Sequence, residues 1–454
     1  MTINKPAIPK GTRDFTPEQY AKRAYIFKTV ESVFKKYGFK PIETPAMEML
    51  STLTGKYGDE GDKLIFKILN SGDYLSDVKA EDYERKDTVH LIPQICEKAL
   101  RYDLTVPFAR FVVQHFNDIT FPFRRYQIQP VWRADRPQKG RYREFYQCDV
   151  DIIGSNALIN EAELIKITDE IFKTLGIEIV IKINNRKVLS GIAEIAGVSE
   201  SLIDITVALD KLDKIGWDKV QEELISKDIP LEAIDKIAQL IKLTETCSNM
   251  LEAVSQFVST SETGQKGIAE IKEILQYATS LQVISPIEFD TTLARGLNYY
   301  TGAIFEVCAR NVEMGSICGG GRYDDLTGIF GLNDVSGVGI SFGADRIYDV
   351  LEMLNLFPET ITNFTKVLIT NLGEKELQYC LPLANKLRSR NIATEIYPDT
   401  AKMKKQMAYA DKNKIKYVVI AGTNEMTNNN VTLKNMFSGE QTEIDARDLI
   451  RLIY

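Results

Sequence analysis

The stretch VWRADRPQKGRYREFYQCDVDIIG, residues 131–154, predicts a β-hairpin with a long basic tip. Its first arm ends near Arg133 and Asp135, and the tip carries four cations: Arg136, Lys139, Arg141 and Arg143. Side chains alternate between the two faces of a strand. The returning arm therefore has one polar and one apolar face: Phe145, Gln147, Asp149 and Asp151 against Tyr146, Cys148, Val150 and Ile152. Such a polar row is either the floor of a pocket or the solvated face of an exposed sheet.

The composition is that of an ordinary globular protein with more than one domain. The chain has 454 residues, 44% hydrophobic and 26% charged, which is longer than one hydrophobic core usually organises. Its amino-terminal segment has no apolar signal core, and no apolar run reaches membrane length, so we expect a cytoplasmic protein. The net charge of −7 argues against a generic nucleic-acid-binding protein but allows a local basic patch.

Neither a disulfide framework nor a metal site is indicated. The cysteines form no CxxC pair; they stand at positions 96, 148, 247, 308, 318 and 380. The two histidines, His90 and His115, show no pattern of ligands or bases. We therefore expect no protein-bound metal, and chemistry based on Arg, Asp, Glu, Gln and Tyr side chains with Mg²⁺.

The amino-terminal part begins with a predicted helix over residues 17–37. Thr16 is its expected N-cap, and Gly38 ends it. In the next segment, FKPIETPAMEML, Pro41 and Pro45 favour an extended chain.

Three further segments carry weaker signals. Residues 57–68 are predicted as a strand and turn, and the polar residues 70–90 as a long surface loop. In LRYDLTVPFARFVVQ we expect Asp103 and Thr105 on one strand face, ahead of a helix that begins at Pro107.

Residues 185–285 are predicted to be an all-helical insertion without chemical motifs, because helical periodicity persists through a region rich in Ile, Leu, Lys and Glu. A helix over 161–175 and a strand over 177–183 precede it, and strand signals resume after it. The insertion would divide one domain into residues 1–184 and 286–358.

Two glycine motifs follow the insertion. The motif CGGGRYDDLTG, residues 318–328, either lets the backbone approach a ligand closely or forms a tight surface turn. In GVGISFGADRIYDVL a strand should lead into a helix near Gly343. Arg346 in the first turn opposes the helix dipole unless an anion binds nearby. A dinucleotide-binding fold is not indicated, because no strand and acidic residue follow at the required spacing.

Residues 366–454 are predicted to be a separate α/β domain with right-handed crossovers. Its expected strands are 366–370, 393–397, 417–421 and 431–434, and its expected helices are 375–388, 402–411 and 445–452. One segment concentrates six lysines: Lys402, Lys404, Lys405, Lys412, Lys414 and Lys416. This set is either a solvated helix face or a surface for phosphate groups.

Several of these motifs, in this order, resemble the class II aminoacyl-tRNA synthetases. WRADRPQKGRYREFYQCDVDIIG resembles the second class motif, GVGISFGADRI the third and FKPIETPAM the proline-bearing first. RYDLTVPFAR, LARGLNYYTG and GGGRYDDLTG are similar to segments of the histidyl-tRNA synthetase family. The resemblance runs from PKGTRDF to the C-terminus. It departs from the usual pattern at four positions: Trp132, Asp135, Asn298 and Cys318.

The resemblance implies an α+β fold: an antiparallel sheet flanked by helices, the helical insertion, and a C-terminal anticodon-binding domain. It implies activation of L-histidine by ATP, accompanied by Mg²⁺, transfer to tRNA(His), and a homodimer formed through the Pro45 motif. One alternative is a class II synthetase for another amino acid, which Asp151 and Tyr300, placed by the resemblance at an imidazole, argue against. The other is a synthetase-like regulatory subunit of histidine biosynthesis, which generally lacks the C-terminal domain.

The resemblance also implies roles for individual residues. The expected catalytic residues, which neutralise the histidine carboxylate and the α-phosphate, are Arg133 and Arg295. The expected ATP site comprises Arg133, Asp135, Arg141, Phe145 stacked on adenine, and Arg346 on the γ-phosphate. The expected histidine site comprises Asp103, Leu104, Thr105, Arg133, Gln147, Asp151, Arg295, Tyr299 and Tyr300, closed by the backbone of 319–321. The expected tRNA contacts are Arg136, Lys139, Arg143, Lys402 and Lys405.

Overall fold

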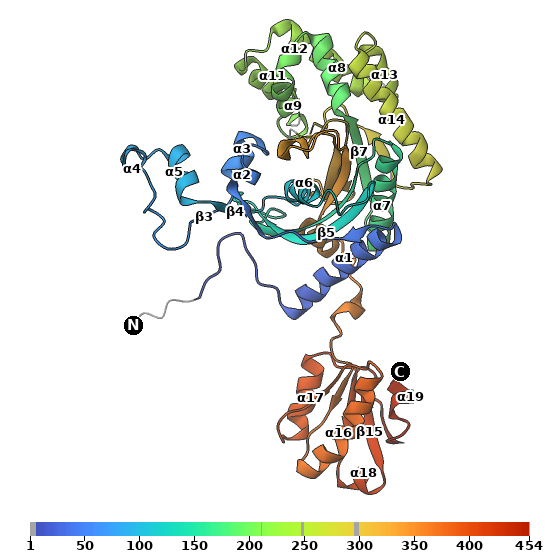
Figure 1. Cartoon of the computed structure of the whole chain (residues 1–454). Helices are drawn as coiled ribbons and strands as arrows, with labels where there is room; N and C mark the ends of the chain where they lie inside the picture. The colour runs from blue at the N-terminus through green and yellow to red at the C-terminus, as the bar shows by residue number, and fades with distance from the viewer. Residues whose placement is uncertain (1–5, 210, 247–248, 295–298, 454) are drawn as a thin grey trace. The chain divides into compact units, whose positions relative to one another are not determined.

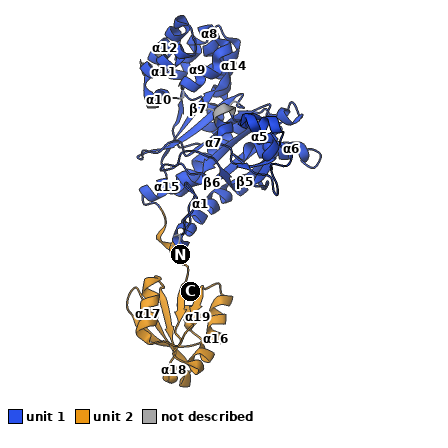
Figure 2. Ribbon diagram, turned by 90° about the vertical axis from the view of Figure 1, so that its left-hand side faces the viewer, with its two compact units in different colours: residues 1–356 blue, residues 357–454 orange. Residues whose placement is uncertain are grey.

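The chain folds into two compact units, Met1–Leu356 and Phe357–Tyr454 (Figure 2). The computed structural model describes residues 6–209, 211–246, 249–294 and 299–453. None of the helices in these ranges is both long enough and apolar enough to cross a lipid bilayer.

Unit 1 is built on an eight-stranded sheet (Figure 1). In spatial order its strands are β1 (Lys40–Pro41), β5 (Phe123–Trp132), β6 (Glu144–Ile153), β11 (Gly337–Gly343), β10 (Cys318–Tyr323), β9 (Ala303–Ala309), β7 (Ile179–Asn185) and β8 (Ile287–Phe289). All neighbours pair antiparallel except the two edge pairs, β1 with β5 and β7 with β8. The predicted hairpin is β5 and β6, and the predicted antiparallel sheet is confirmed.

Three helices cover one face of the sheet: α1 (Pro17–Lys36) and α15 (Ala344–Met353) lie against β6, and α7 (Ile159–Leu175) lies against β11. Thr16 caps α1 as predicted, in a reciprocal capping box with Gln19. The rings of Phe34 on α1 and Phe172 on α7 lie 5.8 and 5.9 Å from that of Phe342 on β11. Because these helices pack on the apolar side of the sheet, the polar face of β6 lies on the opposite side.

A smaller sheet of β2 (Met47–Met49), β4 (Lys98–Leu100) and β3 (Lys67–Ile68) lies beside short helices. These are α2 (Leu50–Leu53), α3 (Gly58–Lys63), α4 (Ala80–Arg85) and α5 (Thr88–Ile95). The prediction of a strand and turn over 57–68 is therefore wrong where α3 forms. The surface-loop prediction for 70–90 is wrong over α4 and the start of α5, where the Asp87 carboxylate accepts a hydrogen bond from the Val89 N–H and caps α5.

Asp103 and Thr105 do not share a strand face, contrary to the prediction. Helix α6 (Thr105–Gln114) begins two residues before Pro107. The reason is a local cap, because Asp103 Oδ1 accepts a hydrogen bond from the Val106 N–H at 3.2 Å.

The insertion consists of helices in its described residues, as predicted. They are α8 (Arg186–Ala196), η1 (Ser199–Ser201), α9 (Leu202–Leu209), α10 (Leu212–Ile215), α11 (Trp217–Ser226), α12 (Leu231–Thr246), α13 (Met250–Phe257) and α14 (Glu262–Ser280). Gly191 on α8 and Gly264 on α14 allow these two helices to approach closely, since a Cβ on Gly191 would lie 2.5 Å from the Gly264 Cα. A further short helix, η2 (Gly328–Phe330), follows β10.

Unit 2 is a sheet with helices, as predicted, but the sheet has five strands where four were expected. The strand order is β13 (Thr394–Ile396), β12 (Val367–Ile369), β14 (Tyr417–Ile420), β15 (Asn430–Asn435) and β16 (Gln441–Asp445). The helices are η3 (Glu359–Thr362), α16 (Glu374–Ser389), α17 (Met403–Lys412), α18 (Thr423–Thr427) and α19 (Leu449–Ile453). The predicted helix at Asp445 is wrong in its first residues, because Asp445 ends the polar edge strand β16. Strand β16 and helix α18 were not predicted.

Candidate active site

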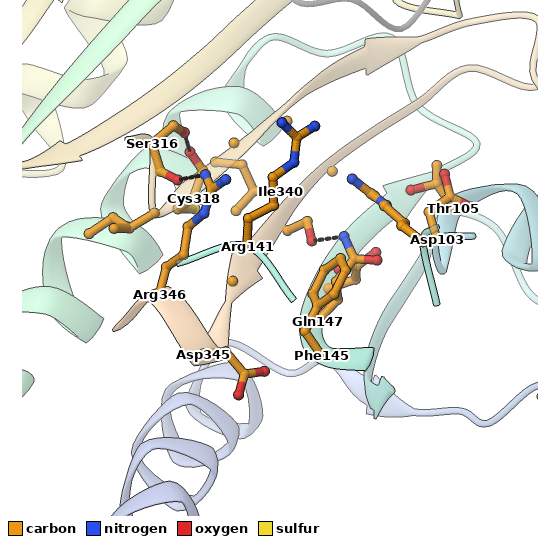
Figure 3. A pocket seen from close by; sticks show the side chains of 18 of the residues that line it. Asp103, Thr105, Arg141, Phe145, Gln147, Ser316, Cys318, Ile340, Asp345 and Arg346 are labelled. Carbon is orange, nitrogen blue, oxygen red and sulfur yellow. Dashed lines mark hydrogen bonds between the residues drawn. The ribbon is translucent and has the colours of Figure 1, made fainter. Parts of the chain in front are cut away.

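A cavity of about 220 Å³ opens on the polar face of β6 (Figure 3). Phe145, Gln147, Asp149 and Asp151 all line it, so this row belongs to a pocket and not to a solvated sheet face. The remaining walls come from β10, β11, the start of α6 and the 133–143 loop.

Glycines allow the pocket wall to form. The CGGGRY segment is the buried strand β10, so the surface-turn interpretation is wrong. A Cβ on Gly320 would lie 1.9 Å from the Gly339 carbonyl oxygen, and a Cβ on Gly339 would lie 1.9 Å from Asp151 Oδ1. The strands and the Asp151 carboxylate can therefore occupy these positions only because both residues lack side chains.

Arg141 and Arg346 lie at one end of the cavity, and the charge of Arg133 acts on both Arg346 and Asp103. Arg346 donates to the carbonyl oxygens of Gly140 and Ser316, at 2.9 and 2.5 Å (Figure 3). Burial lowers the pKa of the Arg346 guanidinium, and the like charges of the other two arginines lower it further. A guanidinium that is held by neutral carbonyls beside other cations favours an anionic ligand.

Arg133 is also held without a carboxylate partner in the described part of the chain. Its Nε donates to the Tyr102 carbonyl at 3.0 Å, and its guanidinium lies 4.2 Å from the centre of the Tyr102 ring. The Phe145 ring lies on its other side at 5.3 Å. Asp135, which the sequence analysis placed at the ATP site, is buried and pairs with Arg141 at 2.8 Å.

The other end of the cavity is lined by buried groups with unused hydrogen-bonding capacity. Asp103 Oδ2, Gln147 Oε1 and Asp149 Oδ1 have no hydrogen-bond partner in the described structure. Asp103 accepts instead through Oδ1 from the Tyr57 hydroxyl, and Gln147 Nε2 donates to the Ser341 hydroxyl. Buried polar atoms are normally hydrogen-bonded, so these three oxygens are expected to accept hydrogen bonds from a ligand.

Asp151 and Asp149 share one buried cation. Arg125 on β5 lies opposite Asp151 in the strand register, and its guanidinium is 2.7 Å from Asp151 Oδ2. The Tyr323 hydroxyl donates to Asp151 Oδ1 at 2.6 Å. Burial raises the pKa of Asp149 to about 7, with Arg125 opposing the shift and Asp151 adding to it. Burial likewise raises the pKa of Asp103.

Most residues predicted for histidine and ATP lie in this one cavity: Asp103, Thr105, Arg133, Asp135, Arg141, Phe145, Gln147, Asp151, Tyr299, Tyr300 and Arg346. Leu104 is fully buried and does not line it. Arg295 and Asn298 lie outside the described residues. Asp149 belongs to the predicted polar row of β6, but no role was predicted for it. Arg125, Tyr323 and Ser341 were not predicted as site residues, because their roles depend on strand register.

The 133–143 loop is fastened at its base by the amino-terminal segment. The Arg143 N–H donates to the Gly11 carbonyl at 2.8 Å. Arg13 pairs with Asp345 on α15, and its guanidinium lies 3.3 Å from the centre of the Tyr142 ring. Of the predicted tRNA-contacting residues, Arg143 therefore also supports the loop.

The other predicted tRNA contacts are exposed. Arg136 and Lys139 lie at the loop tip of unit 1, and Lys402 and Lys405 lie at the start of α17 in unit 2. The histidines His90 and His115 are exposed and pair with Asp87 and Asp118, away from the cavity lining.

The chain matches two family profiles over nearly its full length. Residues 11–81 and 73–347 match the family described as Histidyl-tRNA synthetase, and residues 366–454 match the Anticodon binding domain. The chain belongs to the histidyl-tRNA synthetase family. Two curated relatives named Histidine--tRNA ligase are similar to it from end to end. The protein of Phocaeicola vulgatus is 58% identical and that of Christiangramia forsetii 59%, with 99% and 98% of both chains covered.

Solved structures show the same histidyl-tRNA synthetase fold. The histidyl-tRNA synthetase of Nostoc sp. PCC 7120 superposes with a TM-score of 0.81, at 31% identity and with 99% of each chain covered. A Bacillus halodurans protein described as an ATP phosphoribosyltransferase regulatory subunit/histidyl-tRNA synthetase gives a TM-score of 0.71 at 21% identity, covering 93% of this chain and 99% of its own. That second likeness concerns the fold alone.

Proposed function

We propose that the cavity of this chain activates L-histidine with ATP and that the histidyl group is then transferred to tRNA(His). The overall reaction follows from family membership: the chain is a ligase that joins histidine to tRNA. The observation that carries the site assignment is the cavity lining, which combines three arginines with three buried, partly unpaired acceptors. The arginines suit phosphates and a carboxylate, and the acceptors suit an ammonium group and a ring N–H.

Histidine binds with its α-ammonium among Asp103, Thr105 and Gln147. The unpaired oxygens of Asp103 and Gln147 accept its hydrogens. The imidazole lies between Asp151 and Tyr300, with Tyr299 beside it; all three line the cavity. Leu104 supports this wall from the core.

ATP occupies the arginine end. Adenine stacks on Phe145, and Arg346 contacts the γ-phosphate, with Arg141 and Asp135 completing the site. The histidine carboxylate attacks the α-phosphorus, histidyl-adenylate forms, and pyrophosphate leaves. Both reactants are anions, so Arg133, together with Arg295, holds them in contact and stabilises the charge that develops. Positioning of this kind contributes about 7–11 kcal/mol to lowering a barrier, and each electrostatic donor a few more.

Mg²⁺ enters with ATP, as a counter-ion of the triphosphate. Within the described ranges, no group of three or more His, Cys, Asp or Glu residues could hold a metal ion.

In the second step a hydroxyl at the 3′ end of tRNA(His) attacks the histidyl carbonyl, and AMP leaves. Arg136, Lys139 and Arg143 contact the tRNA near the cavity, whereas Lys402 and Lys405 contact its anticodon region. These exposed lysines give unit 2 a local basic surface on an otherwise acidic chain. The reaction takes place in the cytoplasm.

The direct test is ATP–pyrophosphate exchange measured with each of the twenty amino acids. Histidine alone should support exchange. Exchange with proline or threonine would reassign the amino acid, and no exchange with any of them would favour a regulatory subunit that binds histidine without activating it.

The carboxylate of Asp151 should be required for the histidine end of the cavity. In Asp151→Ala the Arg125 guanidinium loses its ion-pair partner, so we expect kcat/KM for histidine to fall by about 100-fold, the usual scale for a broken buried pair. The KM for ATP should stay within about twofold, since Asp151 forms no ion pair with Arg133, Arg141 or Arg346 in the described structure. An unchanged KM for histidine in the exchange assay would exclude this role.

The homodimer implied by the Pro45 motif would use the edge strand β2. Met47 and Met49 are 54% and 43% exposed, while Glu48 between them is buried and pairs with Arg110. An exposed apolar row on a strand edge is a typical association surface. The double change Met47→Lys and Met49→Lys should shift sedimentation from dimer to monomer at micromolar concentration. Leu231→Lys, an exposed position in the insertion, should not. A dimer unaffected by the double change would place the interface elsewhere.

A further inference from the structure

The two carboxylates deepest on the β6 row differ in what their oxygens contact. Asp151 Oδ1 accepts a hydrogen bond from the Tyr323 hydroxyl, and Asp151 Oδ2 has no hydrogen bond but lies 2.7 Å from the Arg125 guanidinium in an ion pair. Asp149, one step along the same strand face, is 2% exposed. Its Oδ1 has no hydrogen-bond partner among the described residues, although it lines the cavity. The carboxylate that still has an oxygen to offer is therefore Asp149.

The charge balance around Asp149 favours an N–H donor. Arg125 is fully buried and stands against two buried carboxylates, Asp149 and Asp151. Because that guanidinium is already paired with Asp151, the buried Asp149 carboxylate has no full counter-charge of its own when it is ionised. Burying such a charge is costly unless a donor meets it. A ligand that brings an N–H to Oδ1 lowers that cost.

The order of residues along β6 places Asp149 at the level of the histidine ring. Phe145 is assigned to adenine and Gln147 to the α-ammonium; Asp149 and Asp151 follow. Residues on one strand face are roughly 6.6 Å apart, since a strand rises about 3.3 Å per residue. Only two carbons separate the α-nitrogen of histidine from its ring, so with the ammonium group at Gln147 a ring beside Asp151 and Tyr300 also comes within reach of Asp149.

We propose that Asp149 is a specificity-determining residue for histidine, whose free Oδ1 accepts a hydrogen bond from one N–H of the imidazole ring. Asp151, fixed by Arg125 and Tyr323, forms the end wall behind the ring. The proposal rests on the proposed function, since it concerns the amino-acid end of the same cavity. It gives the pocket a means of rejecting any amino acid without a ring or side-chain donor at that level, because Oδ1 would then stay buried and unpaired.

The test compares histidine with its two ring-methylated isomers, 1-methylhistidine and 3-methylhistidine, in ATP–pyrophosphate exchange. The wild-type enzyme should discriminate more strongly against the isomer whose methyl group replaces the N–H at Asp149. In Asp149→Ala, kcat/KM for histidine should fall by about 100-fold, the scale of a lost hydrogen bond to a buried charge. The preference for histidine over that one isomer should shrink by at least about tenfold. Its preference over the other isomer should stay the same, as should the KM for ATP.

A purely structural role for Asp149 predicts a different pattern, in which all three substrates and ATP lose activity together. That pattern, or an unchanged KM for histidine, would overturn the proposal. If Asp149→Ala lacks a cooperative melting transition, Asp149→Asn is tested in its place. Its neutral amide should reduce the preference for histidine over the same methylated isomer, but by a smaller factor. A wild-type protein that fails to exchange with histidine would instead refute the proposed function, so the two failures are separable.

Discussion

Arg133→Gln is expected to slow histidyl-adenylate formation by about 1,000-fold, the loss typical when one preorganised donor to a developing charge is removed. Arg133 is held by the Tyr102 carbonyl and by two aromatic rings, and it pairs with no carboxylate in the described part of the chain. Its charge is therefore available to a substrate. Since no ion pair is broken, the melting temperature should change little. Single-turnover formation of the adenylate measures the effect.

The matched control is Arg136→Gln, which removes the same charge from the exposed loop tip. Adenylate formation should be nearly normal in this variant, because the reaction before tRNA binding does not use the tip. Equal losses in both variants would mean that the loop contributes only a diffuse positive potential. A normal rate in Arg133→Gln would remove Arg133 from the catalytic residues.

Removal of residues 357–454 should nearly abolish tRNA charging while sparing activation. Unit 2 has a hydrophobic core of its own, which includes Val367, Ile369 and Leu387. Its loss therefore leaves the cavity lining, which lies wholly in unit 1, intact. Pyrophosphate exchange should stay within about twofold, and aminoacylation at low tRNA concentration should fall by about 1,000-fold, since several lysine–phosphate contacts are lost.

Binding at different salt concentrations provides the control for this deletion. The dependence of tRNA affinity on salt should be shallower in the shortened chain, because fewer phosphates are neutralised. A folded unit 1 that charges tRNA at the full rate would contradict the assignment of unit 2. Loss of exchange together with a normal melting transition would show that unit 2 also acts on the first step.

Local signals predicted much of the fold. Thr16, Pro17 and the apolar spacing of α1 define that helix, and the alternation on β6 identifies which side chains share the pocket floor. In both cases the information lies within a few neighbouring residues. The same locality explains the errors near Asp103, where a single side-chain hydrogen bond starts a helix two residues before the proline that signals one.

The rest of the site depends on pairings between distant segments. Nothing in the sequence near Arg125 shows that it lies opposite Asp151, because strand register decides this contact. Tyr323 reaches the same carboxylate from β10, across β11. Arg295, assigned by resemblance, lies outside the described residues, so its role stays a prediction.

The hydrogen bonds at the base of the 133–143 loop reduce the conformational entropy that the loop loses when a ligand binds. Arg133 and Arg143 are joined by a backbone hydrogen bond, Ala134 donates to the Leu64 carbonyl, and Arg143 donates to Gly11. Only the residues between Asp135 and Tyr142 lie beyond these bonds. Fixing a backbone residue costs roughly 1–2 kcal/mol in conformational entropy. The tip is held as well, by two backbone hydrogen bonds between Gln138 and Arg141 and by the bond from Arg346 to the Gly140 carbonyl. Because the loop is ordered when the protein folds, nucleotide binding has little of it left to order, and more of the intrinsic binding energy remains to hold ATP.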